Sequence, residues 1–148
     1  MIRNDRVVWA TSMVACGDAD GAVTGNTRRF GASFEKIKQV VDVRKGEIMF
    51  GLNMIVHKGR TIFVGDTSVH EYPTSEQMAE MAISTARVVR LFGFDPKVAF
   101  VSHSTFGQPL TSRTKHIRSA VEILKERKVD FEFDGDMQPD VALNPEYE

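Results

Sequence analysis

The sequence predicts a mixed α/β fold, in which helices cover both faces of a mixed sheet that includes one β-hairpin. Apolar residues recur at helical spacing in several segments, and short runs of strand-forming residues separate the later helices. Residues 48–56 and 61–64 are rich in strand formers and flank a four-residue loop containing Gly59, which predicts the hairpin. With 148 residues, 42% of them hydrophobic, the chain is expected to form a single domain, residues 1–148.

Charge and cysteine content limit the expected partners and compartment. The chain has 19 basic and 20 acidic residues and a formal net charge of -1, so we expect no nucleic-acid partner. No apolar run approaches the roughly 20 residues that span a bilayer, so no membrane partner is expected. The single cysteine, Cys16, excludes an internal disulfide and favours a cytoplasmic protein.

A glycine-rich loop at residues 17–25 lies between two helical patterns, the second of which covers residues 27–41. A short buried strand is expected at residues 22–24, whose carboxyl end would lead into the N-terminus of the second helix. Exposed amides at a helix N-terminus favour anions. Glycines at 17, 21 and 25 would allow positive φ or a close approach of the backbone to a ligand.

The remaining elements alternate between helices and strands. Asn4 or Asp5 is expected to cap the first helix, and a capping box of Thr74 and Gln77 begins a long helix. The later elements are expected to be an interior strand at 98–101, an amphipathic helix at 112–127 and a final strand at 130–133. Strands linked by a helix run parallel, so their carboxyl ends should meet at one edge of the sheet.

Small polar residues follow all four expected strands, in loops at residues 24–26, 66–68, 102–105 and 134–136. Arginines follow two of these loops at helix starts, Arg28 and Arg113. This pattern predicts a cleft for a phosphorylated or otherwise anionic ligand. The alternative is that Ser, Thr and Asp serve in these loops as helix caps and turn formers.

Motifs for metal binding, nucleotide binding and covalent catalysis are missing from the sequence. The 4 histidines are scattered singly, without the spacing of metal ligands, so no metal site is expected. Neither a G-x-G-x-x-G motif nor a P-loop is present. Ser102-His103-Ser104 lacks the G-x-S-x-G turn of a serine hydrolase. No cofactor and no catalytic residue are therefore expected in this chain.

Five segments together resemble the phosphate acetyltransferase family: residues 17–25, 63–69, 73–80, 98–107 and 133–145. The loop at residues 104–109, Ser-Thr-Phe-Gly-Gln-Pro, is similar to that of the family's domain at the carboxyl end of bacterial NADP-dependent malic enzymes. The resemblance implies a fold like that of isocitrate and isopropylmalate dehydrogenases, with two α/β domains facing each other across a cleft. This chain would be one of those domains and a fragment of a larger phosphate acetyltransferase-like region.

The resemblance also implies which residues bind substrate or coenzyme A. They are Asp18, Asp20, Gly21, Thr24, Gly25, Arg28, Ser104, Thr105, Gly107, Arg113 and Arg3. Residues 66–67 and 134–135 would lie near the cleft. The family's catalytic Ser-Arg pair matches no stretch of this sequence, so we expect the chain alone to be inactive.

By the same resemblance, the chain is expected to act as the phosphate acetyltransferase-like domain of an oxaloacetate-decarboxylating malic enzyme. It would bind a coenzyme A thioester, acetyl-CoA, as a regulatory module. Phe106 motivates this, because it stands where phosphate would approach the backbone. Acetyl-CoA or phosphate would be the ligand here, whereas NADP and a divalent metal would bind only in the parent's other domain. The alternatives are part of an active phosphate acetyl/butyryltransferase or a dimerisation scaffold, and a homo-oligomer is expected.

Overall fold

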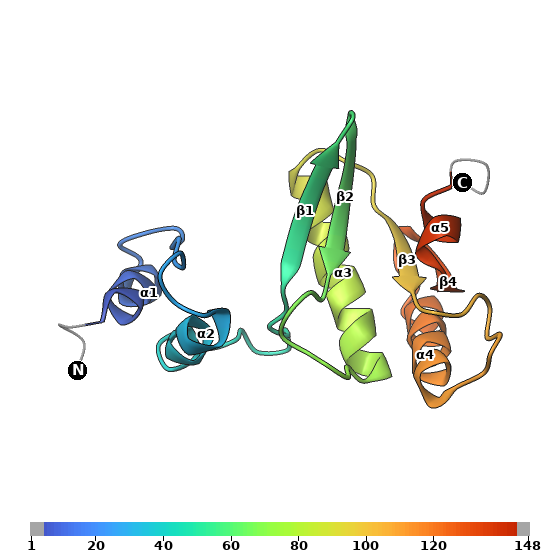
Figure 1. The fold of residues 1–148 in the computed structure, drawn as a ribbon, viewed down its shortest axis with the longest axis horizontal. Helices are drawn as coiled ribbons and strands as arrows, with labels where there is room; N and C mark the ends of the chain where they lie inside the picture. The colour runs from blue at the N-terminus through green and yellow to red at the C-terminus, as the bar shows by residue number, and fades with distance from the viewer. Residues whose placement is uncertain (1–4, 145–148) are drawn as a thin grey trace. The chain divides into compact units, whose positions relative to one another are not determined.

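The computed structural model describes residues 5–144, which belong to two compact units, Met1–Gly46 and Glu47–Glu148 (Figure 1). The first unit contains the helices α1 (Arg6–Cys16) and α2 (Phe30–Lys38). The second contains β1 (Leu52–His57), β2 (Arg60–Gly65), α3 (Ser75–Leu91), β3 (Lys97–Val101), α4 (Ser112–Glu126), β4 (Glu132–Met137) and α5 (Pro139–Ala142). The sequence predicts a single domain with no boundary near residue 46, and that expectation stays a prediction. Within residues 5–144, no helix has the length and apolar character needed to cross a membrane.

Helix α1 begins and ends as its local sequence predicts. The carboxylate of Asp5 accepts hydrogen bonds from the amides of Val7 at 3.0 Å and Val8 at 3.4 Å, which caps the helix. Gly17 ends it with a φ of 81°, because the left-handed conformation is readily available to glycine. Val7 and Thr11 are buried. The first unit is therefore built on a correctly capped helix.

The buried strand expected at residues 22–24 does not form. Residues 21–29 are all exposed, and Val23 is fully so. A strand needs a neighbour to pair its backbone N–H and C=O groups, and the described residues of the first unit contain no strand. Helix α2 is also shorter than the expected 27–41: Arg29 is still extended, and the helix runs from Phe30 to Lys38.

Strands β1 and β2 form the predicted antiparallel hairpin, but with a tighter turn. His57 pairs with Arg60, so the turn is two residues long rather than four. Its residues, Lys58 and Gly59, have φ values of 47° and 79°. Two-residue hairpin turns favour such positive angles because they match the twist of the strands. Strand β1 begins only at Leu52, later than the sequence pattern indicated.

Helices α3 and α4 pack together in the second unit, and each begins with a capping box. The box of Thr74 and Gln77 is the one that the sequence predicts. Ala79 and Ala82 of α3 meet Leu124 of α4 in a buried cluster. Partly buried apolar residues surround this cluster: Ile83, Val98, Phe100, Ile123, Val129, Phe131 and Phe133. The cluster joins α3 and α4 to residues of β3 and β4.

Strands β3 and β4 are parallel and α4 connects them, as predicted. Strand β4 extends to Met137, so residues 134–136 lie inside the strand rather than in a loop after it. Strand β3 is not an interior strand, because its burial alternates between half-buried and exposed residues. The carboxyl ends of β3 and β4 meet at one edge, which brings the loop that follows β3 beside β4.

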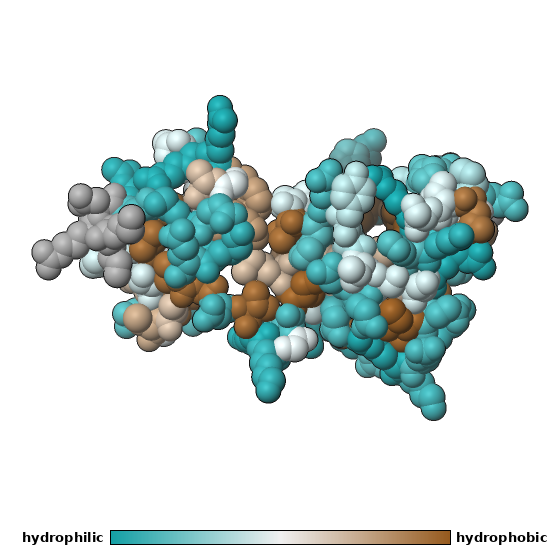
Figure 2. Space-filling view, turned by 90° about the horizontal axis from the view of Figure 1, so that it is seen from below, coloured by the Kyte–Doolittle hydropathy of each residue, from teal (hydrophilic) through white to brown (hydrophobic). Residues whose placement is uncertain are grey.

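The strands make two separate two-stranded sheets, β1–β2 and β3–β4, rather than one mixed sheet. The fold is therefore a mixed α/β fold with small sheets. Small sheets leave apolar faces uncovered. Met54, Ile55 and Val56 of β1 are 49%, 50% and 64% exposed. Figure 2 shows exposed apolar residues in brown on both units.

Candidate functional site

The loop at residues 102–110 is organised by the carboxylate of Asp136, on β4. Asp136 Oδ2 accepts hydrogen bonds from Ser104 Oγ and, at 3.3 Å, from Ser102 Oγ. Its Oδ1 accepts the amide of Gly107 at 2.9 Å. The backbone oxygen of Asp136 accepts the amide of Phe106 at 2.7 Å. One residue of β4 thus fixes the loop that leaves β3.

Three further hydrogen bonds lie within the loop itself. The amide of Ser104 donates to Ser102 Oγ at 2.9 Å. The single hydrogen of that hydroxyl is shared between Asp136 Oδ2 and the backbone oxygen of Ser104, which lies 3.0 Å away. The amide of Gln108 donates to the oxygen of Thr105 at 3.3 Å. The amides of residues 104, 106, 107 and 108 are therefore all engaged inside the protein.

Asp136 remains ionised in this setting. Burial alone would raise the pKa of its carboxyl, because it disfavours the charged form. Hydrogen bonds from Ser104, Gly107 and other donors outweigh burial and hold the pKa below its usual range. Asp136 and Ser104 are both 0% exposed. Their charge and hydroxyl therefore serve the loop and are closed to a ligand.

The predicted site residues of this loop have different roles. Ser104 points into the protein, whereas Thr105 and Gly107 are half-buried. Phe106 is 57% exposed. Phe106 and Gly107 follow each other with φ values of 50° and 79°. The accessible part of the loop is therefore the segment from Thr105 to Gly107.

Asp66, after β2, organises a second polar loop. Its Oδ1 accepts the amides of Gly51, Ser68 and Val69 at 2.8, 2.9 and 3.1 Å. Its Oδ2 accepts the amide of His70 at 2.8 Å and lies 2.8 Å from the ring Nδ1 of that histidine. Burial would raise the pKa of Asp66, but the hydrogen bonds of Ser68 and His70 hold it well below its usual range. Here the aspartate stabilises a turn, which agrees with the alternative that Ser, Thr and Asp serve in these loops as helix caps and turn formers.

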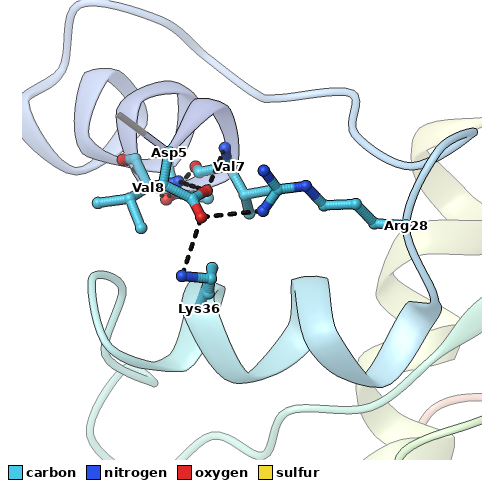
Figure 3. A network of polar contacts seen from close by, with 6 residues as sticks. Asp5, Val7, Val8, Arg28 and Lys36 are labelled. Carbon is cyan, nitrogen blue, oxygen red and sulfur yellow. Dashed lines mark hydrogen bonds and ion pairs between the residues drawn. The ribbon is translucent and has the colours of Figure 1, made fainter. Parts of the chain in front are cut away.

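Arg28, at the end of the glycine-rich loop, binds a carboxylate of its own unit. Its Nη1 lies 2.9 Å from Asp5 Oδ2, and Lys36 Nζ lies 2.9 Å from the same oxygen (Figure 3). These two cations, Lys36 more than Arg28, hold the pKa of Asp5 well below its usual range. The other predicted residues of this loop are all exposed: Asp18, Asp20, Gly21, Thr24 and Gly25. The charge of Arg28 is thus partly neutralised by Asp5.

Arg113, at the start of α4, stacks on an aromatic ring. Its guanidinium carbon lies 4.5 Å from the centre of the Tyr72 ring. Arg113 is itself exposed. Arg3 lies outside the described residues. Among residues 5–144, no group of three or more His, Cys, Asp or Glu side chains could hold a metal ion.

Sequence reasoning placed Asp136 in a polar loop of the predicted cleft but did not foresee that it holds the 102–110 loop, and it missed Arg118. In the pairing of β3 with β4, Phe100 lies opposite Gly135 and the next residue, Val101, lies opposite Met137. This irregularity leaves Asp136 without a partner on β3, and its side chain bonds to the loop instead. Arg118 of α4 lies against Gly107: a Cβ added to that glycine would be 3.1 Å from Arg118 Nη1. The sequence signals for Asp136 were its position just after a predicted strand and its place in the family-like segment 133–145. Nothing in the pattern of α4 distinguished Arg118.

The fold and the loop define a mixed α/β domain in which a parallel strand pair carries a polar loop at its carboxyl edge. The family model described as "Phosphate acetyl/butaryl transferase" matches residues 1–148, and the chain belongs to this family. It is 45% identical over 97% of its length to an NADP-dependent malic enzyme of Rhizobium meliloti (strain 1021), of which it covers 19%. It is 33% identical over 95% of its length to a phosphate acetyltransferase of Nitratidesulfovibrio vulgaris, of which it covers 20%.

Solved structures show the same fold. A phosphotransacetylase from Streptococcus pyogenes matches with a TM-score of 0.82 and 27% identity, over 94% of this chain and 43% of that one. The EutD phosphotransacetylase from Staphylococcus aureus matches with a TM-score of 0.76 and 27% identity, over 95% and 44%. The chain thus spans about a fifth of its curated relatives and less than half of these structures.

Proposed function

We propose that this phosphate acetyltransferase-like domain belongs to a larger protein of the malic enzyme type and binds acetyl-CoA as a regulatory ligand. The observation that carries the proposal is the hydrogen-bonding of the 102–110 loop to Asp136. Because Ser104 and Asp136 are enclosed and bonded to each other, neither is open to act as a nucleophile or base. A loop held in this way is preorganised for binding.

The exposed part of the loop supports binding without transfer. A phosphoryl or acyl group that reacts needs free donors aimed at the charge that develops on it. The amides of Phe106 and Gly107 already donate to Asp136, and Phe106 presents an exposed ring between Thr105 and Gly107. An aromatic ring suits stacking with a flat group such as the adenine of coenzyme A.

The proposal extends to the whole protein. Its similarity to NADP-dependent malic enzymes favours a parent in which NADP and a divalent metal bind elsewhere. The remainder of the parent would supply the facing domain of a cleft like that of isocitrate dehydrogenase. We further propose that the parent protein is cytoplasmic. We also propose that it is a homo-oligomer, in which binding in one cleft can shift a distant active site.

The test uses the full-length protein that contains this chain. Calorimetry should detect acetyl-CoA binding, and saturating acetyl-CoA should change the apparent affinity for malate by about 5- to 150-fold, the usual range of coupling between sites. A matched titration with acetylcarnitine, which has an acetyl group but no phosphate, should have no effect. If acetyl-CoA binds but leaves malate oxidation unchanged at every concentration, the regulatory role is wrong. If it does not bind, a dimerisation scaffold becomes the better explanation.

A working phosphate acetyl/butyryltransferase is the second candidate, favoured by the 33% identity to a phosphate acetyltransferase. It predicts acetyl phosphate formation from acetyl-CoA and phosphate by the full-length protein at about 1–10³ per second. Turnover in that range would replace the regulatory proposal. Binding of acetyl-CoA without turnover would favour the regulatory one.

A further inference from the structure

We propose that Arg118 binds a phosphate group of the coenzyme A thioester at the 102–110 loop, an inference that rests on the proposed function. The three arginines expected from the sequence are Arg3, Arg28 and Arg113. The first lies outside the described residues, the second pairs with Asp5, and the third stacks on Tyr72. Arg118 was not among them, but its position fits the task better, as does its lack of an ion pair or hydrogen bond to any described residue.

Arg118 extends from α4 to the accessible segment of the loop. A Cβ built on Gly107 would lie 3.1 Å from Arg118 Nη1 and 3.8 Å from its Cδ. The first separation is tighter than nine in ten real Cβ contacts, so a larger residue at position 107 would push the guanidinium away by a few tenths of an ångström. Gly107 also has a φ of 79°, which disfavours other residues. The glycine thus leaves the space that the guanidinium occupies.

The charge of Arg118 is available. Among residues 5–144, Arg118 has no ion pair and no hydrogen bond, and the residue is exposed. By contrast, other arginines of the second unit pair with carboxylates: Arg87 with Glu47, Arg90 with Asp130, and Arg127 with Glu76 and Glu80. The carboxylate of the loop, Asp136, is enclosed and satisfied by its own donors.

An anion at this loop would gain from a side-chain cation, because four of the loop amides already donate within the protein. The amides of residues 104, 106, 107 and 108 all donate within the protein. A guanidinium offers two parallel donors that match two phosphate oxygens. Lys115 precedes Arg118 by three residues and therefore lies on the same side of α4, where it adds a second positive charge.

The experiment measures acetyl-CoA affinity by calorimetry in the full-length protein. Arg118→Gln should weaken binding about 10-fold or more, because a charged hydrogen bond is lost, and Arg118→Lys should restore part of it. Gly107→Ala should also weaken binding. The matched control, Arg87→Gln, removes an equivalent charge from α3 and should change the affinity less than 2-fold. Arg118→Gln should also reduce the dependence of log Kd on log salt concentration.

Each outcome separates the two proposals. If the wild-type protein binds acetyl-CoA and Arg118→Gln binds it equally well, the assignment of Arg118 is wrong while the proposed function stands. The assignment of Arg118 would also be wrong if Arg118→Gln and Arg87→Gln weakened binding equally. It would be wrong, too, if Arg118→Lys restored no affinity and the salt dependence stayed unchanged. Failure of the wild-type protein to bind acetyl-CoA would overturn both. Hydrogen exchange at residues 102–107 should match the wild type in Arg118→Gln, which shows that the loop is intact.

Discussion

Two of the polar loops predicted to line a ligand cleft, the glycine-rich loop 17–25 with Arg28 after it and the 102–110 loop, are each held by one aspartate, but in different ways. Asp5 holds the end of the first through Arg28 and Lys36, whose side chains are each 38% exposed. Asp136 holds the second through hydroxyls and amides, and is itself 0% exposed. Surface ion pairs contribute little because water and salt compete with them, whereas enclosed hydrogen bonds resist both.

Similar sequence signals can therefore produce unlike sites. Both segments contain small polar residues and glycine, and each includes or follows an expected strand. In the first, the strand does not form and residues 21–29 are exposed. In the second, a neighbouring parallel strand supplies the carboxylate that orders the loop. A polar loop is shaped by what packs beside it.

Asp136→Ala should have the largest effect in this comparison. It leaves the hydroxyl of Ser104 and the amide of Gly107 without their acceptor, which should cost about 2–4 kcal/mol of local stability. Hydrogen exchange at residues 102–107 of the full-length protein should therefore accelerate at least about 30-fold. Asp134→Ala, which alters an exposed neighbour on β4, is the control. Unchanged exchange in Asp136→Ala would contradict the role given to this carboxylate.

Ser104→Ala should have a smaller effect on the same segment. It removes one donor to Asp136 but leaves those of Ser102 and Gly107, so the local cost should be about 1–2 kcal/mol. The acceleration of exchange should be roughly 5- to 30-fold. Ser112→Ala, at an exposed position on α4, is the control and should leave the exchange of residues 102–107 unchanged. An effect as large as that of Asp136→Ala would mean that Ser104 is the dominant partner.

Acid should loosen the 102–110 loop gradually. The pKa of Asp136 is lower in the folded protein than the usual value of about 3.9, so its ionised form stabilises the fold. That contribution is fully present above about pH 4 and is lost as the pH falls through the folded pKa. Exchange at residues 102–107, corrected for the intrinsic pH dependence, should accelerate below pH 4. Asp136→Asn should lack this dependence, and an equal dependence in both proteins would contradict the assignment.

Asp5→Asn should have the smallest effect and be the most sensitive to salt. Asparagine caps helices as well as aspartate, so the change removes the ion pairs with Arg28 and Lys36 while keeping the cap. Exchange at residues 7–8 should change little, and the difference from wild type should vanish at 1 M salt. Residues 102–107, which depend on Asp136, should show no such salt dependence. A large effect of Asp5→Asn that persists at high salt would contradict this ranking.

Features that depend on near neighbours along the chain could be predicted from the sequence. The cap at Asp5, the end of α1 at Gly17 and the capping box at Thr74 each involve groups a few residues apart, so the local pattern sufficed. The hairpin followed from the same kind of signal, although its turn is two residues shorter than expected. The parallel pairing of β3 and β4 followed from the handedness of a strand–helix–strand connection. Motifs spread over the whole chain were enough to indicate the family.

Features that join residues far apart in the sequence could be seen only in the folded chain. Asp136 and Ser104 are 32 positions apart, and their hydrogen bond exists because α4 returns β4 alongside β3. The approach of Arg118 to Gly107 depends on how the loop packs against α4. The missing strand at residues 22–24 has the same cause, because a strand requires a partner elsewhere in the chain. Contacts over such distances are set by packing, which the order of residues along the chain does not display.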